Sequence, residues 1–235
     1  MKLLTTSNYK IRKSRARQWM TFGLHLSPHT ISGVNFCSSA SPGCIESCLN
    51  TAGHGTYRAT QDARYRRSRK FIDNPKTFLA TLMQDVASGI AKATKAGYGC
   101  AFRLNLTSDI PWERLPIPGY DMPIMSLFPA AQFYDYTKSV ARMRRYLEGK
   151  MPTNYHLTFS RSEINQKECE EVLDIGGSVA VVFAKRLPDL WHKRPVIDGD
   201  FDDLRFFDPH NSVVGLVAKG KGRYDTSGFV ITNHL

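Results

Sequence analysis

Three cysteines lie close together in the segment NFCSSASPGCIESCLN. Cys37, Cys44 and Cys48 have the spacing C-x6-C-x3-C. Three thiolates on one short loop can bind an iron–sulfur cluster and leave one iron open, or supply three of the four ligands of a zinc ion. Pro42 and Gly43 directly precede the middle cysteine and favour a tight turn, in which backbone N–H groups can face an anionic cluster. The sequence therefore predicts a metal site, with a [4Fe–4S] cluster as the first interpretation and zinc as the second.

Other roles for cysteine remain open. A buried thiol can simply fill a core, and Cys100 and Cys169 lie in strand-like and helix-like segments where this role is expected. A disulfide framework is not expected, because the five cysteines are an odd number and the N-terminal residues lack the apolar stretch of a signal peptide. His25, His29 and His54 flank the three clustered cysteines, and any of them could be a fourth ligand that closes the metal site.

Strand-like and helix-like segments alternate along the 235 residues. Apolar runs predict strands at 31–37, 100–109, 132–138, 154–163, 178–185, 213–220 and 227–232. Helical periodicity and glycine stops predict helices at 59–71, 75–97, 139–150 and 164–177. The alternation predicts an α/β fold, a partial or complete β/α barrel with a cysteine cluster-binding loop after the first strand. We expect one domain over 1–235, with a basic N-terminal arm at 1–20, the cysteine loop at 33–58 and a C-terminal strand and loop region at 195–235.

Polar residues follow several predicted strands, which is where β/α barrels place their active sites. We expect five of them to bind cofactor or substrate, namely Asn105, Ser108, Asp135, Ser160 and Arg161. Tyr136 and Lys138 are the candidate catalytic residues, Tyr136 as a donor of a hydrogen atom or proton. Lys138 could instead only neutralise a phosphate. Helix capping is the alternative role for Ser108 with Asp109, and for Ser162 with Glu163.

The chain carries a formal charge of +11, and its cations are grouped. One group lies at 10–17 and another at 142–145. The largest follows the cysteine loop and consists of Arg58, Arg64, Arg66, Arg67, Arg69 and Lys70. Such clusters are typical of nucleic-acid binding, with a solvated basic face as the alternative. Tyr57, Tyr65 and Phe71 lie among these cations and could stack on bases or anchor a core.

An acidic run near the C-terminus is a second candidate site. It contains Asp198, Asp200, Asp202, Asp203 and Asp208, which could bind a hard cation and serve a metal-dependent nuclease. The run lacks the twelve-residue loop of an EF-hand. A turn paired with Arg194 and Arg205 is the favoured interpretation. No segment approaches the roughly 20 apolar residues that span a bilayer, so no membrane partner is expected.

Several long motifs resemble the phage gene product 88 family. They are GLHLSPHTISGVNFCSSASPGCIESCLNTAGHG, RLNLTSDIPWE, FYDYTK, NYHLTFSRSE and VIDGDFDDLRFFDP, with GLVAKGKGRYDTSGFV near the C-terminus. The resemblance covers nearly the whole chain. It implies a phage or prophage protein that acts in the cytoplasm of the infected host, and it implies no particular activity.

A more distant similarity is to radical S-adenosylmethionine enzymes, in which three cysteines after the first strand bind a [4Fe–4S] cluster. The number and placement of the cysteines match, whereas the usual spacing there is C-x3-C-x2-C, and NLTSD stands where a glycine-rich motif is usual. This similarity implies S-adenosylmethionine as a cofactor and a radical enzyme that acts on nucleic acid or a nucleotide. The alternative function is a non-enzymatic nucleic-acid-binding protein whose three-cysteine metal site is structural.

Overall fold

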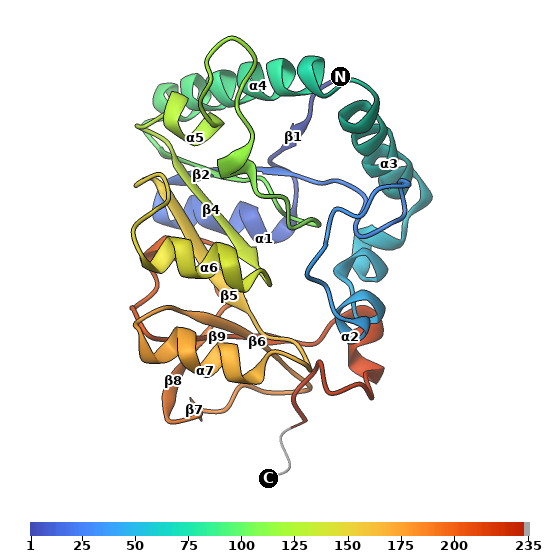
Figure 1. Cartoon of the computed structure of the whole chain (residues 1–235), viewed down its shortest axis with the longest axis vertical. Helices are drawn as coiled ribbons and strands as arrows, with labels where there is room; N and C mark the ends of the chain where they lie inside the picture. Colours follow the sequence, from blue (N-terminus) through green and yellow to red (C-terminus); the bar gives the residue numbers. More distant parts are fainter. Residues whose placement is uncertain (233–235) are drawn as a thin grey trace.

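Nine strands form one sheet in the order β1-β2-β3-β4-β5-β6-β9-β8-β7 in the computed structural model, which describes residues 1–232. Neighbouring strands are parallel from β2 to β8, whereas β1 and β7 are short antiparallel strands at the two edges (Figure 1). The strands are β1 (Leu4–Thr5), β2 (Trp19–Leu24), β3 (Gly99–Arg103), β4 (Gln132–Thr137), β5 (Tyr155–Ser160), β6 (Val179–Phe183), β7 (Leu190–Trp191), β8 (Arg194–Asp198) and β9 (Val213–Val217).

Helices connect most of the parallel strands. They are α1 (Tyr9–Arg12), α2 (Pro42–Glu46), α3 (Arg58–Asp73), α4 (Pro75–Lys95), α5 (Ile124–Leu127), α6 (Val140–Leu147) and α7 (Gln166–Asp174). Short 3-10 turns are η1 (Lys13–Arg17), η2 (Leu49–Thr51), η3 (Gly53–Thr56), η4 (Trp112–Arg114), η5 (Arg205–Phe207) and η6 (Gly220–Tyr224).

Helices α4, α6 and α7 bury one face of the sheet. In α4 the apolar side chains recur at helical spacing, and Phe78, Leu82 and Val86 are fully buried. This helix begins where Asn74 accepts a hydrogen bond from the Thr77 N–H and Pro75 occupies its first turn. The resulting core is continuous from β2 to β9, so the strand ends are held at one edge of a rigid sheet.

The N-terminal arm and the segment around η5 cover the opposite face of the sheet. Trp19, Tyr134 and Phe206 pack together there. Beneath them, the fully buried Asp203 accepts two hydrogen bonds of 2.9 Å from Arg103 and lies 3.5 Å from the Lys10 ammonium group. The basic arm predicted at 1–20 therefore packs on the sheet through this ionic cluster as well as through apolar side chains.

The predicted α/β class is confirmed, and the barrel is not: β1 and β7 form two separate edges, so the sheet is open. The predicted first strand at 31–37 was wrong. Gly33 has a φ of +90°, which breaks an extended run, and the first parallel strand is β2. Residues 227–232 form only a bridge from Ile231 to Phe183. The start of the C-terminal strand and loop region predicted at 195–235 lies in β8, which pairs with β9 in the sheet.

Most of the remaining predictions are close to the observed elements. The predicted helices at 59–71, 75–97, 139–150 and 164–177 correspond to α3, α4, α6 and α7. Within the described residues, no helix is both long and apolar enough to span a bilayer.

We expect Asp203→Asn to lower the free energy of unfolding by about 3–5 kcal/mol, because the substitution leaves the buried Arg103 guanidinium without its counter-charge. Urea unfolding followed by circular dichroism measures this effect. The matched control is Asp198→Asn, at an exposed position, which should change stability by no more than about 0.5 kcal/mol. Equal effects of the two substitutions would contradict a structural role for the buried cluster.

Candidate metal centre

The segment that carries the cysteines crosses the edge at which the parallel strands end (Figure 1). It leaves the end of β2, and Cys37 lies near the end of β3, with its Sγ 3.8 Å from the Thr107 carbonyl oxygen. The Asp109 N–H binds the carbonyl of Phe36 at 2.7 Å. Farther along, the segment reaches the end of β5 and the C-terminal residues before α3 begins. Each cysteine is therefore supported by a different part of the sheet edge.

Glu163, which follows β5, holds the middle of this segment. Its carboxylate accepts a hydrogen bond of 2.6 Å from the Ser41 hydroxyl and one of 2.8 Å from the Gly43 N–H at the start of α2. Burial opposes ionisation, but these two hydrogen bonds hold the pKa of Glu163 below its ordinary value. A Cβ atom at Gly43 would lie 2.2 Å from Ser227 Oγ and 2.9 Å from the Glu163 carboxylate, so this contact requires glycine.

Two of the cysteine sulfur atoms accept backbone hydrogen bonds. The His29 N–H lies 3.4 Å from Cys37 Sγ, and the Asn50 N–H lies 3.5 Å from Cys48 Sγ. Burial raises the pKa of Cys37 to about 11; the His29 N–H opposes this, and negative charge on Cys48 adds to it. Burial also raises the pKa of Cys48, with the Asn50 N–H opposing and Cys44 adding to the rise. The three thiols thus lie within electrostatic reach of one another.

Two cations face the same thiols. Arg64 and Lys138 both favour the thiolate form of Cys48. Arg64 is only 6% exposed, donates a hydrogen bond to the Asn50 side chain and has no hydrogen-bond partner at Nε. Burial lowers its pKa, and Cys48 opposes this. A buried guanidinium beside half-buried thiols suits an anionic group at this position.

Cys44 packs against residues from the C-terminal part of the chain. Its neighbours there are Ala218, Phe229 and Val230. Arg161 fixes this part by donating hydrogen bonds of 2.6 Å to the Gly228 carbonyl and 2.9 Å to the Phe229 carbonyl. The sequence did not predict these neighbours, because the residues around Cys44 carry no signal for a contact with residues so far along the chain.

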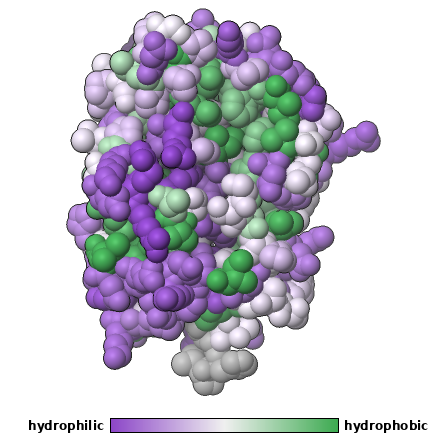
Figure 2. Space-filling model, in the orientation of Figure 1, coloured by the Kyte–Doolittle hydropathy of each residue, from purple (hydrophilic) through white to green (hydrophobic). Residues whose placement is uncertain are grey.

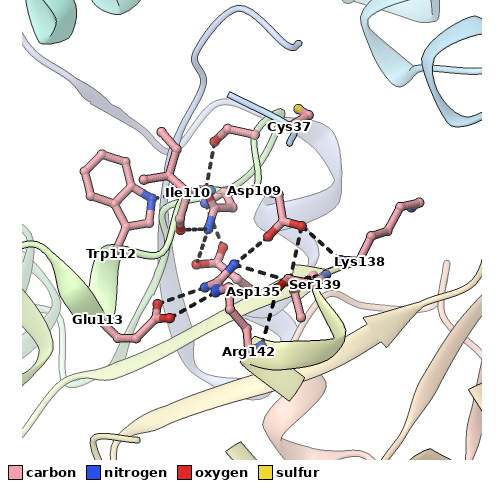
Figure 3. Close-up of polar contacts among 12 residues, drawn as sticks. Cys37, Asp109, Ile110, Trp112, Glu113, Asp135, Lys138, Ser139 and Arg142 are labelled. Atoms are coloured by element: carbon pink, nitrogen blue, oxygen red, sulfur yellow. Dashed lines mark hydrogen bonds and ion pairs between the residues drawn. The ribbon is translucent and has the colours of Figure 1, made fainter. Parts of the chain in front are cut away.

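A polar network lies under Cys37 (Figure 3). Arg142 donates two hydrogen bonds to Glu113, of 3.0 and 2.9 Å, and a short one to Asp109. Asp109 also accepts from the Lys138 backbone N–H at 2.9 Å. The network fixes the turns after β3 and β4 relative to each other, and so fixes the surface on which Cys37 rests. The sequence pattern had indicated a nucleic-acid-binding group for Arg142 and no role for Glu113.

Three of the predicted cofactor-binding residues are part of this buried network. Asn105 accepts hydrogen bonds from the Ser108 hydroxyl and the Trp112 indole, and its own N–H donates to Asp135 at 2.7 Å. Burial raises the pKa of Asp135 to about 7, against the opposing effect of the Asn105 N–H. Since Asn105, Ser108 and Asp135 are buried and bonded to protein groups, they position the loop after β3. Their binding of a cofactor stays a prediction.

Lys138 and Ser160 lie near the cysteines, whereas Tyr136 belongs to the cluster of Lys10 and Arg103 on the other face of the sheet. Lys138 Nζ donates a hydrogen bond of 2.7 Å to the Ser160 hydroxyl and lies 5.3 Å from the centre of the Phe229 ring. In Figure 3 the Lys138 side chain extends away from the buried network. The Arg103 guanidinium lies over the ring of Tyr136, 4.5 Å from the centre of that ring. The buried hydroxyl of Tyr136 has no hydrogen-bond partner. The structure thus brings Lys138 and Ser160 together beside the cysteines.

The three histidines occupy different environments. Both ring nitrogens of His25 have polar neighbours, Asn8 at 3.3 Å and Thr107 at 3.5 Å, and burial lowers its pKa to about 3, aided by Arg64. His54 is exposed, and its ring contacts that of Tyr57 in a tilted arrangement. His29 is half-buried, and its backbone already contacts Cys37. A histidine as the fourth ligand stays a prediction.

The cations after the cysteine loop mostly turn inward. Arg67 donates to the His25 carbonyl at 2.9 Å, Arg69 pairs with Asp73, and Lys70 binds the Thr81 hydroxyl at 3.1 Å. Arg64 lies at the cysteines. Of the predicted group, Arg58 and Arg66 are therefore the members whose side chains are exposed. Nucleic-acid binding by the whole group stays a prediction.

Cations neutralise much of the acidic run. Arg205 lies 3.1 Å from both Asp202 and Asp208, and Lys219 lies 2.6 Å from Asp200. The favoured interpretation, a turn paired with Arg194 and Arg205, holds for Arg205, whereas Arg194 pairs with Asp174 at 2.9 Å. Across residues 1–232, no three side chains of His, Cys, Asp or Glu are grouped closely enough to surround a single metal ion.

An open, mostly parallel α/β sheet with a three-cysteine segment across its strand ends defines the class of this protein. A family model described as Gene product 88 matches residues 2–233, so the chain belongs to the gene product 88 family. The family membership expected from the sequence motifs is therefore confirmed. No curated protein and no solved structure matches the chain.

We expect Glu163→Ala to loosen the cysteine segment, because it removes the acceptor for the Ser41 hydroxyl and the Gly43 N–H. Loss of such a cap costs about 1–2 kcal/mol locally, which corresponds to about 5–30-fold more frequent opening. The rate of thiol labelling in metal-free protein should rise by this factor. Glu163→Gln, which keeps one acceptor oxygen, should show a smaller increase, and the exposed Glu170→Ala should show none. Identical rates for all three variants would contradict the anchoring role.

The pKa of Asp135 predicts a pH dependence of stability. With a pKa of about 7 in the folded state and about 4 in the unfolded chain, the folded state retains a proton that the unfolded state loses between these values. The free energy of unfolding therefore falls as pH rises through this window. Asp135→Asn should make this fall shallower by up to about 1.4 kcal/mol per pH unit, measured by urea unfolding. The exposed Asp62→Asn is the control, and a slope unchanged in Asp135→Asn would refute the raised pKa.

Proposed function

We propose that this protein is an iron–sulfur protein in which Cys37, Cys44 and Cys48 each bind one iron of a [4Fe–4S] cluster. The observation that carries the proposal is the pair of backbone N–H groups directed at Cys37 Sγ and Cys48 Sγ. Hydrogen bonds to sulfur stabilise the anionic cluster and tune its reduction potential. A cluster also suits thiols that do not converge on one point in residues 1–232, because each thiolate would bind a different iron, whereas a zinc ion draws its ligands to a single point.

The charges around the thiols support an anionic occupant. Burial makes the free thiolates unfavourable, whereas metal binding deprotonates a coordinating thiol outright. Arg64 and Lys138 then lie beside a negative group that offsets their own burial. Phe229 and Val230 cover Cys44 on the side of the C-terminal segment and limit the access of water there.

The fourth iron would be bound either by His29 or by a ligand from solution. We propose S-adenosylmethionine as this ligand, which would make the protein a radical-type enzyme acting on nucleic acid or a nucleotide. Two features support the proposal: the cysteine segment directly follows the first of the consecutive parallel strands, and Lys138 with Ser160 can bind an anionic group beside it. The bound cluster would supply the electron that cleaves this cofactor.

The chain's own residues would have distinct roles in such a reaction. Lys138 would hold a carboxylate or phosphate through its ammonium group, which the Ser160 hydroxyl orients. Arg161 would keep the segment that contains Phe229 closed over Cys44. Lys138 follows the end of β4, whereas Tyr136 lies on that strand with its ring against Lys10 and Arg103. Its unpaired hydroxyl is the group available to donate a hydrogen atom or proton.

Electron paramagnetic resonance of anaerobically purified, dithionite-reduced protein tests the proposal. We expect a [4Fe–4S]⁺ signal, with iron and sulfide bound, and a change in this signal when S-adenosylmethionine is added. Cys37→Ser, Cys44→Ser or Cys48→Ser should each lose most of the iron. Cys100→Ser is the matched control, since this half-buried cysteine lies on β3 outside the segment.

The possible outcomes separate the parts of the proposal. A cluster signal that is indifferent to S-adenosylmethionine would retain the iron site and eliminate the radical chemistry. Zinc in place of iron would overturn the cluster and favour a structural metal site.

A further inference from the structure

Three exposed tyrosines surround the cysteine segment. Tyr57 and Tyr65, at the start and in the middle of α3, are 59% and 45% exposed, and Tyr224 at the end of η6 is 83% exposed. Large aromatic side chains are normally buried to a greater extent, so exposed rings near a candidate site point to a ligand that stacks on them. The space-filling view shows hydrophobic residues at the surface on this side of the molecule, whereas strongly hydrophilic residues cover α6 (Figure 2).

The elements that carry these tyrosines adjoin the same stretch of chain. A Cβ atom at Gly220, in η6, would lie 2.8 Å from the Ala52 Cβ and 2.9 Å from the Thr51 carbonyl oxygen. The ring of His54, two residues after Ala52, contacts the ring of Tyr57 at a tilt, with 5.1 Å between ring centres. Residues 49–56 therefore join η6 to the start of α3, and the tyrosines lie along one surface that begins at Cys48.

Cations lie between the tyrosines. Arg58 has a side chain that is 96% exposed, with only a long contact of 4.0 Å to Asp62. Arg66 is also exposed, and because residues seven or eight apart share a helix face, Tyr65 and Arg66 lie on the same side of α3 as Arg58. On η6, Lys221 and Arg223 are exposed beside Tyr224. We call these seven residues the tyrosine–arginine surface: Tyr57, Arg58, Tyr65, Arg66, Lys221, Arg223 and Tyr224.

A depression at one end of this surface can receive a planar group. Its volume is about 370 Å³, within the usual range for ligand pockets, and it opens beside α2. It combines an aromatic ring with hydroxyl, carboxylate and ammonium groups, which can hydrogen-bond to the edge of a base. The lining residues are Glu46, Ser47, Lys221, Tyr224, Asp225 and Thr226.

We infer that the tyrosine–arginine surface binds single-stranded nucleic acid, with bases stacked on the tyrosines and phosphates on the interleaved cations. Stacking platforms alternating with cations are the chemistry of single-strand recognition. A duplex does not offer its base faces to such rings. The inference rests on the proposed function for the role of the bound strand, which would be the substrate brought to the cysteine site, and it identifies that substrate as single-stranded.

Fluorescence anisotropy with labelled oligonucleotides of about 12 residues tests the inference. We expect the full chain to bind single-stranded DNA or RNA more tightly than the matching duplex. The triple variant Tyr57→Ala, Tyr65→Ala, Tyr224→Ala should weaken single-strand binding by about tenfold or more. The double variant Arg58→Gln, Arg66→Gln should reduce the slope of log affinity against log salt by about 1.4, from two phosphate contacts at about 0.7 each.

The matched control is Arg144→Gln, Arg145→Gln on α6, which removes two cations on the hydrophilic face and should leave single-strand binding unchanged (Figure 2). Tighter binding to the duplex, no binding at about 50 mM salt, or equal losses for the α3 and α6 variants would each overturn the inference. The assay is run on metal-free and metal-loaded protein. Strand binding by protein that takes up no iron under anaerobic loading would refute the cluster and retain the surface, and iron uptake without strand binding would do the reverse.

Discussion

Parallel strands all end at the same edge of a sheet, and a segment that crosses this edge contacts every strand end in turn. Residues 25–57 make this crossing, and they contain little regular structure of their own. The segment depends on groups that the sheet presents, namely the Thr107 carbonyl after β3, Lys138 after β4 and Glu163 after β5. The spacing of the three thiols is therefore set by the spacing of the strands, and the buried network of Arg142, Asp109 and Glu113 keeps two of those strand ends in register.

The sequence predicted helices and strands correctly where the pattern within one element is enough to define it. Helical periodicity placed α4 and α6, and the nearly pure apolar run of β6 marked a buried strand. The first strand was missed because residues 31–37 are rich in apolar side chains, yet Ile31 and Val34 are 46% and 44% exposed and Gly33 turns the chain. The actual first parallel strand, β2, was not predicted, because it directly follows the basic residues of the N-terminal arm.

The candidate site was predictable in part. The sequence shows residue types that can bind a metal, but it does not show which other residues hold them in place. The three cysteines and Lys138 were identified from spacing and from their position after a strand. Arg64 was assigned to a basic surface, since its sequence neighbours are cationic, yet it lies buried beside Cys48. Whether an arginine faces solvent or a thiol depends on which face of α3 packs inward, and the tertiary structure decides this. A net charge of +11 therefore overstates the basic surface open to nucleic acid.

The cover of Cys44 also has a consequence for biosynthesis. Phe229 and Val230, which pack on this thiol, are separated from it by nearly the whole chain, and Arg161 holds them through backbone carbonyls that do not exist until those positions have been translated. On the ribosome, a nascent chain that stops short of residue 228 leaves Cys44 uncovered. Contacts between residues so distant in sequence form late and slowly. During synthesis this thiol is therefore open to solvent and to oxidation until the C-terminal segment folds over it.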